Sequence, residues 1–189
     1  MTGHLPDFAA EDSSFRIECL IRDEASPAIQ DRIDTTITRL YDLESADHLS
    51  DVEVCVWGSR LRRSNPGAPD RTSRGWERYK AFETWARDTG HDLAPSFQTW
   101  CGQTFLHEES WETVVVPIIT LAIYDDETDR LRAVVPCTYD DRSRTVEECL
   151  VALESAARVD SVPSGGQPEN ESRPEPGPTV LAEPDRPAT

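Results

Sequence analysis

The stretch FRIECLIRDEASPAIQDRIDTTITRLYDLESADHLSDVEVCVWG, residues 15–58, predicts a β-α-β unit. The first half of Phe15–Arg22 alternates apolar and polar side chains, so this segment is predicted to be a strand. Ser26 followed by Pro27 is typical of a helix start, because serine favours the N-cap and proline the first helical position. Apolar side chains then recur at helical spacing and give one apolar face, formed by Ile29, Ile33, Ile37 and Leu40.

The end of the stretch, VEVCVWG at Val52–Gly58, alternates again and predicts a second strand. Strands joined through a helix lie in one sheet, and such a crossover connects parallel strands. We therefore expect the two strands to be parallel, with the intervening helix packed on one face of their sheet.

Downstream of this unit, the arginine-rich segment SRLRRSNPGAPDRTSRG predicts an irregular loop over residues 59–75. A second helix is expected from Trp76 to Thr89, with Gly90 in the C′ position where glycine often ends a helix. A short strand is expected within residues 96–104.

A continuous apolar run, VVVPIITLAIY at Val114–Tyr124, predicts a strand buried on both faces. The polar DDETD sequence after it predicts a hairpin turn into LRAVVPCTY at Leu131–Tyr139. Each strand contains a proline, Pro117 or Pro136, which cannot donate to the hydrogen-bond ladder. We expect regular pairing between these two prolines, with a bulge or a sheet corner where they lie.

The folded part of the sequence ends with a third predicted helix. Thr145-Val-Glu-Glu148 has the capping-box pattern of a helix start. The apolar face of this helix consists of Val146, Cys149, Leu150, Leu153 and Ala157. The predicted fold class is α+β: a mixed sheet of about four to five strands, with the opening β-α-β unit and the later β-hairpin, packed with about three helices.

The expected domain organisation is one folded α+β domain over residues 15–157. Residues 1–14 are polar and acidic and predict a disordered N-terminus. Residues 158–189 are rich in Pro, Glu, Ser and Gly and predict a disordered acidic tail.

The charge balance predicts a halophilic cytoplasmic protein. The chain has 36 acidic and 19 basic residues, a net charge of −17, and Lys80 is its one lysine. A carboxylate-rich surface with arginine in place of lysine stays hydrated in concentrated salt, where charge repulsion is screened. No apolar run is long enough to span a membrane, so no membrane association is expected. The five cysteines form no CxxC motif and are expected to be reduced core residues.

One basic cluster stands out against this acidic background and is the candidate site for DNA or an acidic protein partner. Trp76 and Tyr79 are interleaved with its members, which suits nucleic-acid binding. The cluster consists of Arg60, Arg62, Arg63, Arg71, Arg74, Arg78 and Lys80. The alternative interpretation is a solvated loop that leads into a helix, with the aromatic residues divided between the core and its rim.

Other chemistry is weakly indicated. Cys101, His107, Glu108 and Glu109 match no structural zinc spacing, and no cysteine has a histidine placed to activate it. The glycines form no phosphate-binding loop. The sequence therefore predicts no metal and no cofactor, and an enzyme is less favoured than a regulatory protein or a module that binds a protein or a small ligand.

Four segments carry a resemblance to a known family: FRIECLIRDEASPAIQDRID, WERYKAFETWARDTGHDLAPSF, VVVPIITLAIYDD and LRAVVPCTYDD. In order and spacing they resemble haloarchaeal proteins labelled as helix-turn-helix domain. The resemblance implies a halophilic origin and a role in transcription. A helix-turn-helix module needs two helices joined by a short turn. Each predicted helix here is flanked by strands, so the sequence predicts no such pair.

Overall fold

The computed structural model describes residues 14–23, 26–62, 70–103 and 110–160, and the statements below concern these ranges. The predicted disordered N-terminus and tail lie outside them, apart from residues 14 and 158–160. In chain order the elements are β1 (Phe15–Arg22), α1 (Pro27–Ser45), β2 (Asp51–Trp57), β3 (Arg60–Arg62), α2 (Asp70–Thr89), β4 (Gln98–Gln103), β5 (Ser110–Val115), β6 (Ile119–Asp125), β7 (Arg130–Val135), β8 (Cys137–Tyr139), β9 (Arg142–Arg144) and α3 (Val146–Asp160).

A four-stranded mixed sheet in the order β2-β1-β6-β7 forms the centre of the molecule. β1 pairs with β2 in parallel, as the opening β-α-β unit predicts, and β6 pairs antiparallel with β1 and β7. Cys19 of β1 lies opposite Val54 on one side and Leu121 on the other. The predicted α+β class with a mixed sheet is therefore confirmed.

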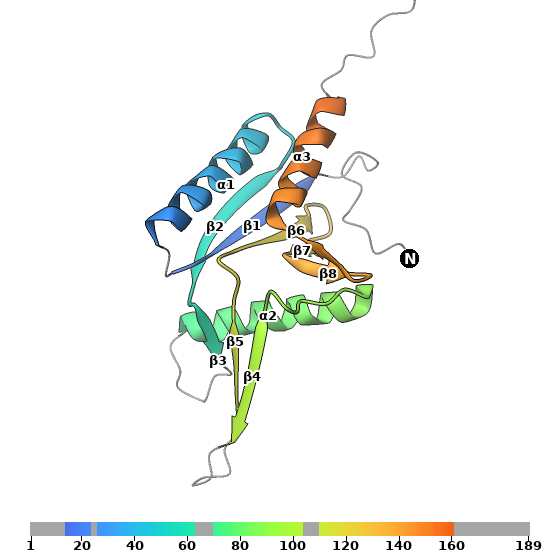
Figure 1. Ribbon diagram of the computed structural model, residues 1–189. Coiled ribbons are helices and arrows are strands. Elements are labelled where there is room, and N and C mark those ends of the chain that lie inside the picture. The colour runs from blue at the N-terminus through green and yellow to red at the C-terminus, as the bar shows by residue number, and fades with distance from the viewer. Residues whose placement is uncertain (1–13, 24–25, 63–69, 104–109, 161–189) are drawn as a thin grey trace, which may run out of the picture.

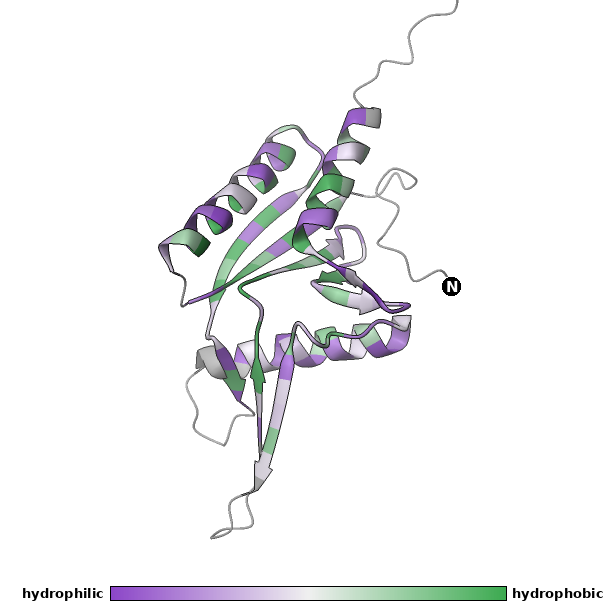
Figure 2. Ribbon diagram, in the orientation of Figure 1, coloured by the Kyte–Doolittle hydropathy of each residue, from purple (hydrophilic) through white to green (hydrophobic). Residues whose placement is uncertain are grey.

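Helices cover both faces of this sheet. α1 and α3 lie side by side on one face, and α2 crosses the other (Figure 1). Arg39 of α1 joins the two neighbouring helices, because its Nε donates to Glu154 at 2.6 Å and its Nη1 to Glu147 at 2.8 Å. Figure 2 shows β6 as largely hydrophobic, whereas much of α2 is hydrophilic. One apolar cluster links the central sheet with all three helices.

The predicted helix starts are found where the local signals place them. Ser26 is extended and precedes α1, and Pro27 is its first residue, although the serine side chain makes no capping hydrogen bond. At α3 the capping box is complete: the Thr145 N–H donates to Glu148 at 2.8 Å, and the Glu148 N–H donates to the Thr145 hydroxyl at 3.2 Å. Two backbone donors at this helix end are thereby satisfied.

The predicted loop over residues 59–75 is wrong at both of its ends. β3 occupies part of it, and α2 begins at Asp70 rather than at Trp76. Leu61 links the two elements. It is buried between two exposed arginines, as in a strand with one covered face, and it packs against Gly75 in the part of α2 that was predicted to be loop. A Cβ on Gly75 would lie 2.8 Å from Leu61 Cδ2, so glycine allows this close approach. Residues 63–69 lie outside the described ranges.

The apolar run 114–124 is two strands rather than one. β5 belongs to a separate antiparallel sheet in the order β3-β5-β4, and β6 belongs to the central sheet. Pro117 lies between them, so the predicted sheet corner is confirmed at this position. Both flanks of the corner are bonded, since the Val116 N–H donates to Ser59 O at 3.3 Å and Ile118 O accepts from the Arg22 N–H at 2.9 Å.

The predicted strand 131–139 is also divided at its proline. β7 pairs with β6, as the predicted hairpin requires, but β8 pairs with β9 across a two-residue turn. Asp140 and Asp141 form this turn and both have positive φ, which is the backbone of a type I′ hairpin turn.

The cysteine prediction holds in part. All five are free, and Cys19, Cys137 and Cys149 are buried. Cys55 is half-buried and Cys101 is exposed, so these two are not core residues. Cys101 lies on β4, where the strand is no longer covered by the core.

Candidate nucleic-acid interface

The described members of the basic cluster are divided between β3 and α2. Arg60 and Arg62 lie on β3 and are exposed, whereas Arg74 is exposed on the first half of α2. Arg71 also belongs to α2, but its side chain lies outside what the structure describes, and Arg63 lies between the described ranges. Arg78 and Lys80 complete the set on α2.

The register of the small sheet places the two β3 arginines beside a tryptophan. Arg62 pairs with Thr113 of β5, and Thr113 pairs with Trp100 of β4. Paired residues of an antiparallel sheet point to the same face. Arg62 and Trp100 therefore flank Thr113 on one face, and the exposed fraction of Trp100 is 59%.

The neighbouring row on this face begins with the second arginine. Arg60 pairs with Val115 of β5, and Val115 pairs with Gln98 of β4. We call this surface the outer sheet face; it comprises Arg60, Arg62, Gln98, Trp100, Thr113 and Val115. Two guanidinium groups, an amide and an indole ring are thus arranged on one side of a small sheet.

The opposite face of the small sheet is fixed on α2. Leu61 and Val114 are buried there, and the Thr99 hydroxyl lies 3.3 Å from the Tyr79 hydroxyl of α2. The β4–β5 hairpin projects from the rest of the molecule (Figure 1). The outer sheet face is therefore presented on a supported platform, and a two-stranded β-ribbon is an element that nucleic-acid grooves accept.

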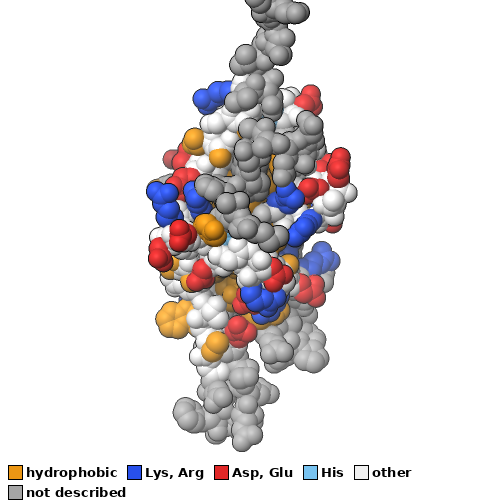
Figure 3. Space-filling view, turned by 90° about the vertical axis from the view of Figure 1, so that its right-hand side faces the viewer, with side chains coloured by type: hydrophobic (Ala, Val, Ile, Leu, Met, Phe, Trp, Pro, Cys, Tyr) orange, Lys and Arg blue, Asp and Glu red, His pale blue; other side chains and the backbone are white. Residues whose placement is uncertain are grey.

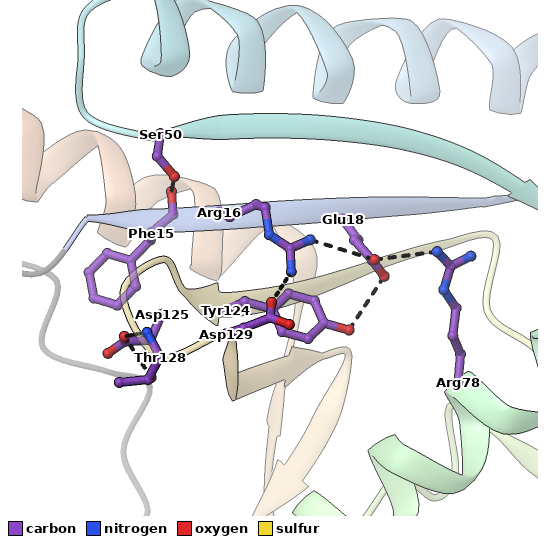
Figure 4. A network of polar contacts seen from close by, with 9 residues as sticks. All are labelled: Phe15, Arg16, Glu18, Ser50, Arg78, Tyr124, Asp125, Thr128 and Asp129. Carbon is purple, nitrogen blue, oxygen red and sulfur yellow. Dashed lines mark hydrogen bonds and ion pairs between the residues drawn. The ribbon is translucent and has the colours of Figure 1, made fainter.

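Arg78 has a different environment, because it points to the central sheet (Figure 4). Its Nη2 donates to Glu18 of β1 at 3.3 Å, and Glu18 is only 7% exposed. Glu18 also accepts from the Tyr124 hydroxyl at 3.4 Å and lies 3.7 Å from Arg16. Burial, followed by the Glu18 charge, raises the pKa of Tyr124. Arg78 is thus part of a polar network between α2 and the sheet.

Lys80 is also engaged within α2. Its Nζ is hydrogen-bonded to Glu83, and further along the helix Arg87 pairs with Asp88 at 3.4 Å. The exposed side of α2 therefore mixes both signs of charge. Figure 3 shows the same mixture of acidic and basic side chains on the face that it presents.

A family model described as a helix-turn-helix domain matches residues 9–158 of this sequence. The chain belongs to this family. The match spans every helix and strand described above except the last two residues of α3. It confirms the family that the sequence resembles, whereas the haloarchaeal origin stays a prediction. A comparison with curated proteins found no match.

Within the described ranges, the family's helix-turn-helix name corresponds to no pair of helices joined by a short turn. β2 and β3 separate α1 from α2, and six strands separate α2 from α3. α2 is also held in the core through Tyr79, Phe82, Trp85 and Ala86.

The described residues offer neither a metal site nor a membrane-spanning helix. In the part of the chain that the structure describes, no group of His, Cys, Asp and Glu side chains could hold a metal ion. Three of the residues considered from sequence, His107, Glu108 and Glu109, lie outside it. No described helix is both long and apolar enough to cross a membrane.

Sequence reasoning missed Trp100 and Gln98 as members of the candidate site. The sequence indicates both the basic cluster and the short strand that contains Trp100, but the whole of α2 separates this strand from Arg60 and Arg62. The available signal was an aromatic residue on a strand with polar neighbours, in the sequence Gln-Thr-Trp. Its proximity to the arginines follows only from pairing through β5.

Proposed function

We propose that this chain is a non-enzymatic regulatory protein of a halophilic cytoplasm that binds nucleic acid through the outer sheet face. The observation that carries the proposal is the placement of Arg60, Arg62 and the exposed Trp100 on one face of the projecting sheet. Membership of a helix-turn-helix domain family supports a role with DNA.

The combination of arginine with an exposed indole suits nucleic acid in concentrated salt. Phosphate contacts lose affinity as salt rises, because counterions released from the nucleic acid gain less entropy in a more concentrated salt solution. Stacking of a base on an aromatic ring is worth about 1–3 kcal/mol and does not depend on counterion release. Trp100 would therefore provide affinity that survives in a salt-rich cytoplasm, while Arg60 and Arg62 position the backbone.

The direct test is a titration with labelled single-stranded and duplex DNA, followed by fluorescence anisotropy at the lowest salt that keeps the protein folded. Trp100→Ala should weaken binding by about 5- to 150-fold, the equivalent of one lost stacking contact. A plot of log affinity against log salt concentration should have a slope smaller in magnitude by about two for the Arg60→Gln/Arg62→Gln variant, one for each lost phosphate contact. Because all three side chains are exposed or partly exposed on a sheet face, the fold should be retained.

Arg87→Gln is the matched control for this test, because Arg87 is exposed on α2 but lies at the far end from β3. It should leave DNA affinity nearly unchanged. Absence of wild-type binding to either DNA at micromolar concentration would refute the nucleic-acid role. A role as a protein-binding or small-ligand module would then take its place.

The halophilic part of the proposal predicts a loss of stability in dilute buffer. The net charge of −17 repels itself more strongly as the Debye length grows from about 3 Å in molar salt to about 10 Å in 0.1 M salt. The thermal unfolding midpoint should therefore fall when molar KCl is replaced by dilute KCl. Equal midpoints at both concentrations would contradict a salt-adapted surface.

A further inference from the structure

We propose that a hollow beside the outer sheet face is a binding site for a small phosphate-bearing molecule with an apolar or aromatic part. The hollow has a volume of about 480 Å³ and lies between β2–β3 and the first half of α2. This volume is within the range of small-molecule sites, about 300–1,000 Å³. The hollow shares Arg60 with the outer sheet face, but its other lining residues lie outside that face.

The position of the hollow is one that favours ligands. β1 and β2 are parallel and end at Arg22 and Trp57, and both Asp23 and Trp57 line the hollow. In sheets with parallel strands, ligands bind in the crevice outside the carboxyl ends of the strands. Here α2 forms the other wall of that crevice.

The charge of the lining favours an anion. Arg60, Arg74 and Arg78 all line the hollow, and among its lining residues the one carboxylate is Asp23. Asp23 Oδ1 already accepts a hydrogen bond from the Ser59 N–H at 3.1 Å. Arginine matches the geometry of a phosphate group with two parallel hydrogen bonds. Arg78 is already paired with Glu18 at 3.3 Å, so Arg60 and Arg74 are the groups that we assign to the phosphate, with Arg78 adding positive charge to the wall of the hollow.

One unsatisfied polar atom belongs to a residue that lines the hollow. The indole Nε1 of Trp57 is buried without a hydrogen bond among the described residues. Trp57 lines the hollow and is 6% exposed. A buried donor without an acceptor costs about 1–3 kcal/mol, so such atoms are normally paired. A ligand oxygen in the hollow would give the Trp57 indole an acceptor after a small movement of the ring toward the hollow.

The remaining lining explains the apolar part of the proposed ligand. Val56 is 67% exposed and lines the hollow together with the buried Leu61. Gly58 and Gly75 also line it and leave room because they have no side chain. The site therefore offers cationic groups on one side and an apolar surface on the other, as a nucleoside monophosphate or a similar phosphomonoester requires.

The test uses the full chain in molar KCl with adenosine monophosphate as the probe and adenosine as its phosphate-free match. Isothermal titration calorimetry should show one binding site for the monophosphate and none for adenosine. The monophosphate should also raise the thermal unfolding midpoint. Arg74→Gln should weaken binding at least about 10-fold, as expected for loss of a hydrogen bond to a charged group. Arg74 is exposed, so this variant should fold.

Two controls separate this site from the outer sheet face. Arg87→Gln should bind the monophosphate as wild type does, and so should Trp100→Ala, even if the latter loses DNA binding. Failure of the monophosphate to bind at millimolar concentration would overturn the proposal. So would equal binding by wild type and Arg74→Gln, or loss of binding in Trp100→Ala.

Discussion

Phe82→Ala is expected to lower the free energy of unfolding by about 3–5 kcal/mol, the usual cost of removing a large buried ring. Phe82 is fully buried on the inner side of α2. Its ring meets Trp57 of β2 edge-on, with the ring centroids 6.3 Å apart. The variant should therefore lose both the contact between helix and sheet and the packing around a second aromatic residue. Denaturant unfolding in molar KCl measures the loss.

Thr84→Ala is the control, because Thr84 is exposed on the same helix and should change stability by no more than about 0.5 kcal/mol. If Phe82→Ala costs as little as this control, α2 is not anchored on the central sheet. A large loss has a functional meaning as well. A helix that holds the core together cannot leave it to enter a DNA groove, so any contact by α2 must use its exposed side.

Arg78→Leu is expected to lower the free energy of unfolding by about 2 kcal/mol. Removing one partner of a buried ion pair typically costs about 3–5 kcal/mol, because the other charge stays buried. The cost should be smaller here, since the Arg78 side chain is 34% exposed and Arg16 remains close to Glu18. The measurement is chemical unfolding in molar KCl.

The double variant Glu18→Leu/Arg78→Leu tests the origin of that loss. It leaves no unpaired carboxylate beneath α2. Its loss of unfolding free energy should therefore be smaller than the sum of the losses in the two single variants. A double-mutant cycle with Glu18→Leu gives the coupling between the two groups. Strictly additive losses would show that the Arg78 guanidinium and the Glu18 carboxylate do not stabilise each other.

The parts of the fold that sequence predicted well have local causes. The β-α-β unit follows from alternation and helical spacing within residues 15–58. The start of α3 follows from Thr145 and Glu148 alone. Gly90 adopts a positive φ after α2, as its predicted C′ position requires. Pro117 lies at a corner because proline cannot donate a ladder hydrogen bond.

The parts that sequence did not predict depend on distant contacts. β3 has three residues, too few for alternation to be recognised, and its burial depends on Gly75 of α2. The apolar run around Pro117 gives no sign that its two halves enter different sheets. The candidate site has the same difficulty, since Arg62 and Trp100 meet only through Thr113 of β5.

The corner at Pro117 also has a mechanical meaning. β2 continues into β3 and β5 continues into β6, so the small sheet grows from both neighbours of β1, and the Val116–Ser59 hydrogen bond ties the two connections together. A load applied to the projecting hairpin would be transmitted as torque to two strands of the central sheet at once. We therefore expect a force on the small sheet to reach the central sheet through both connections rather than through a single hinge.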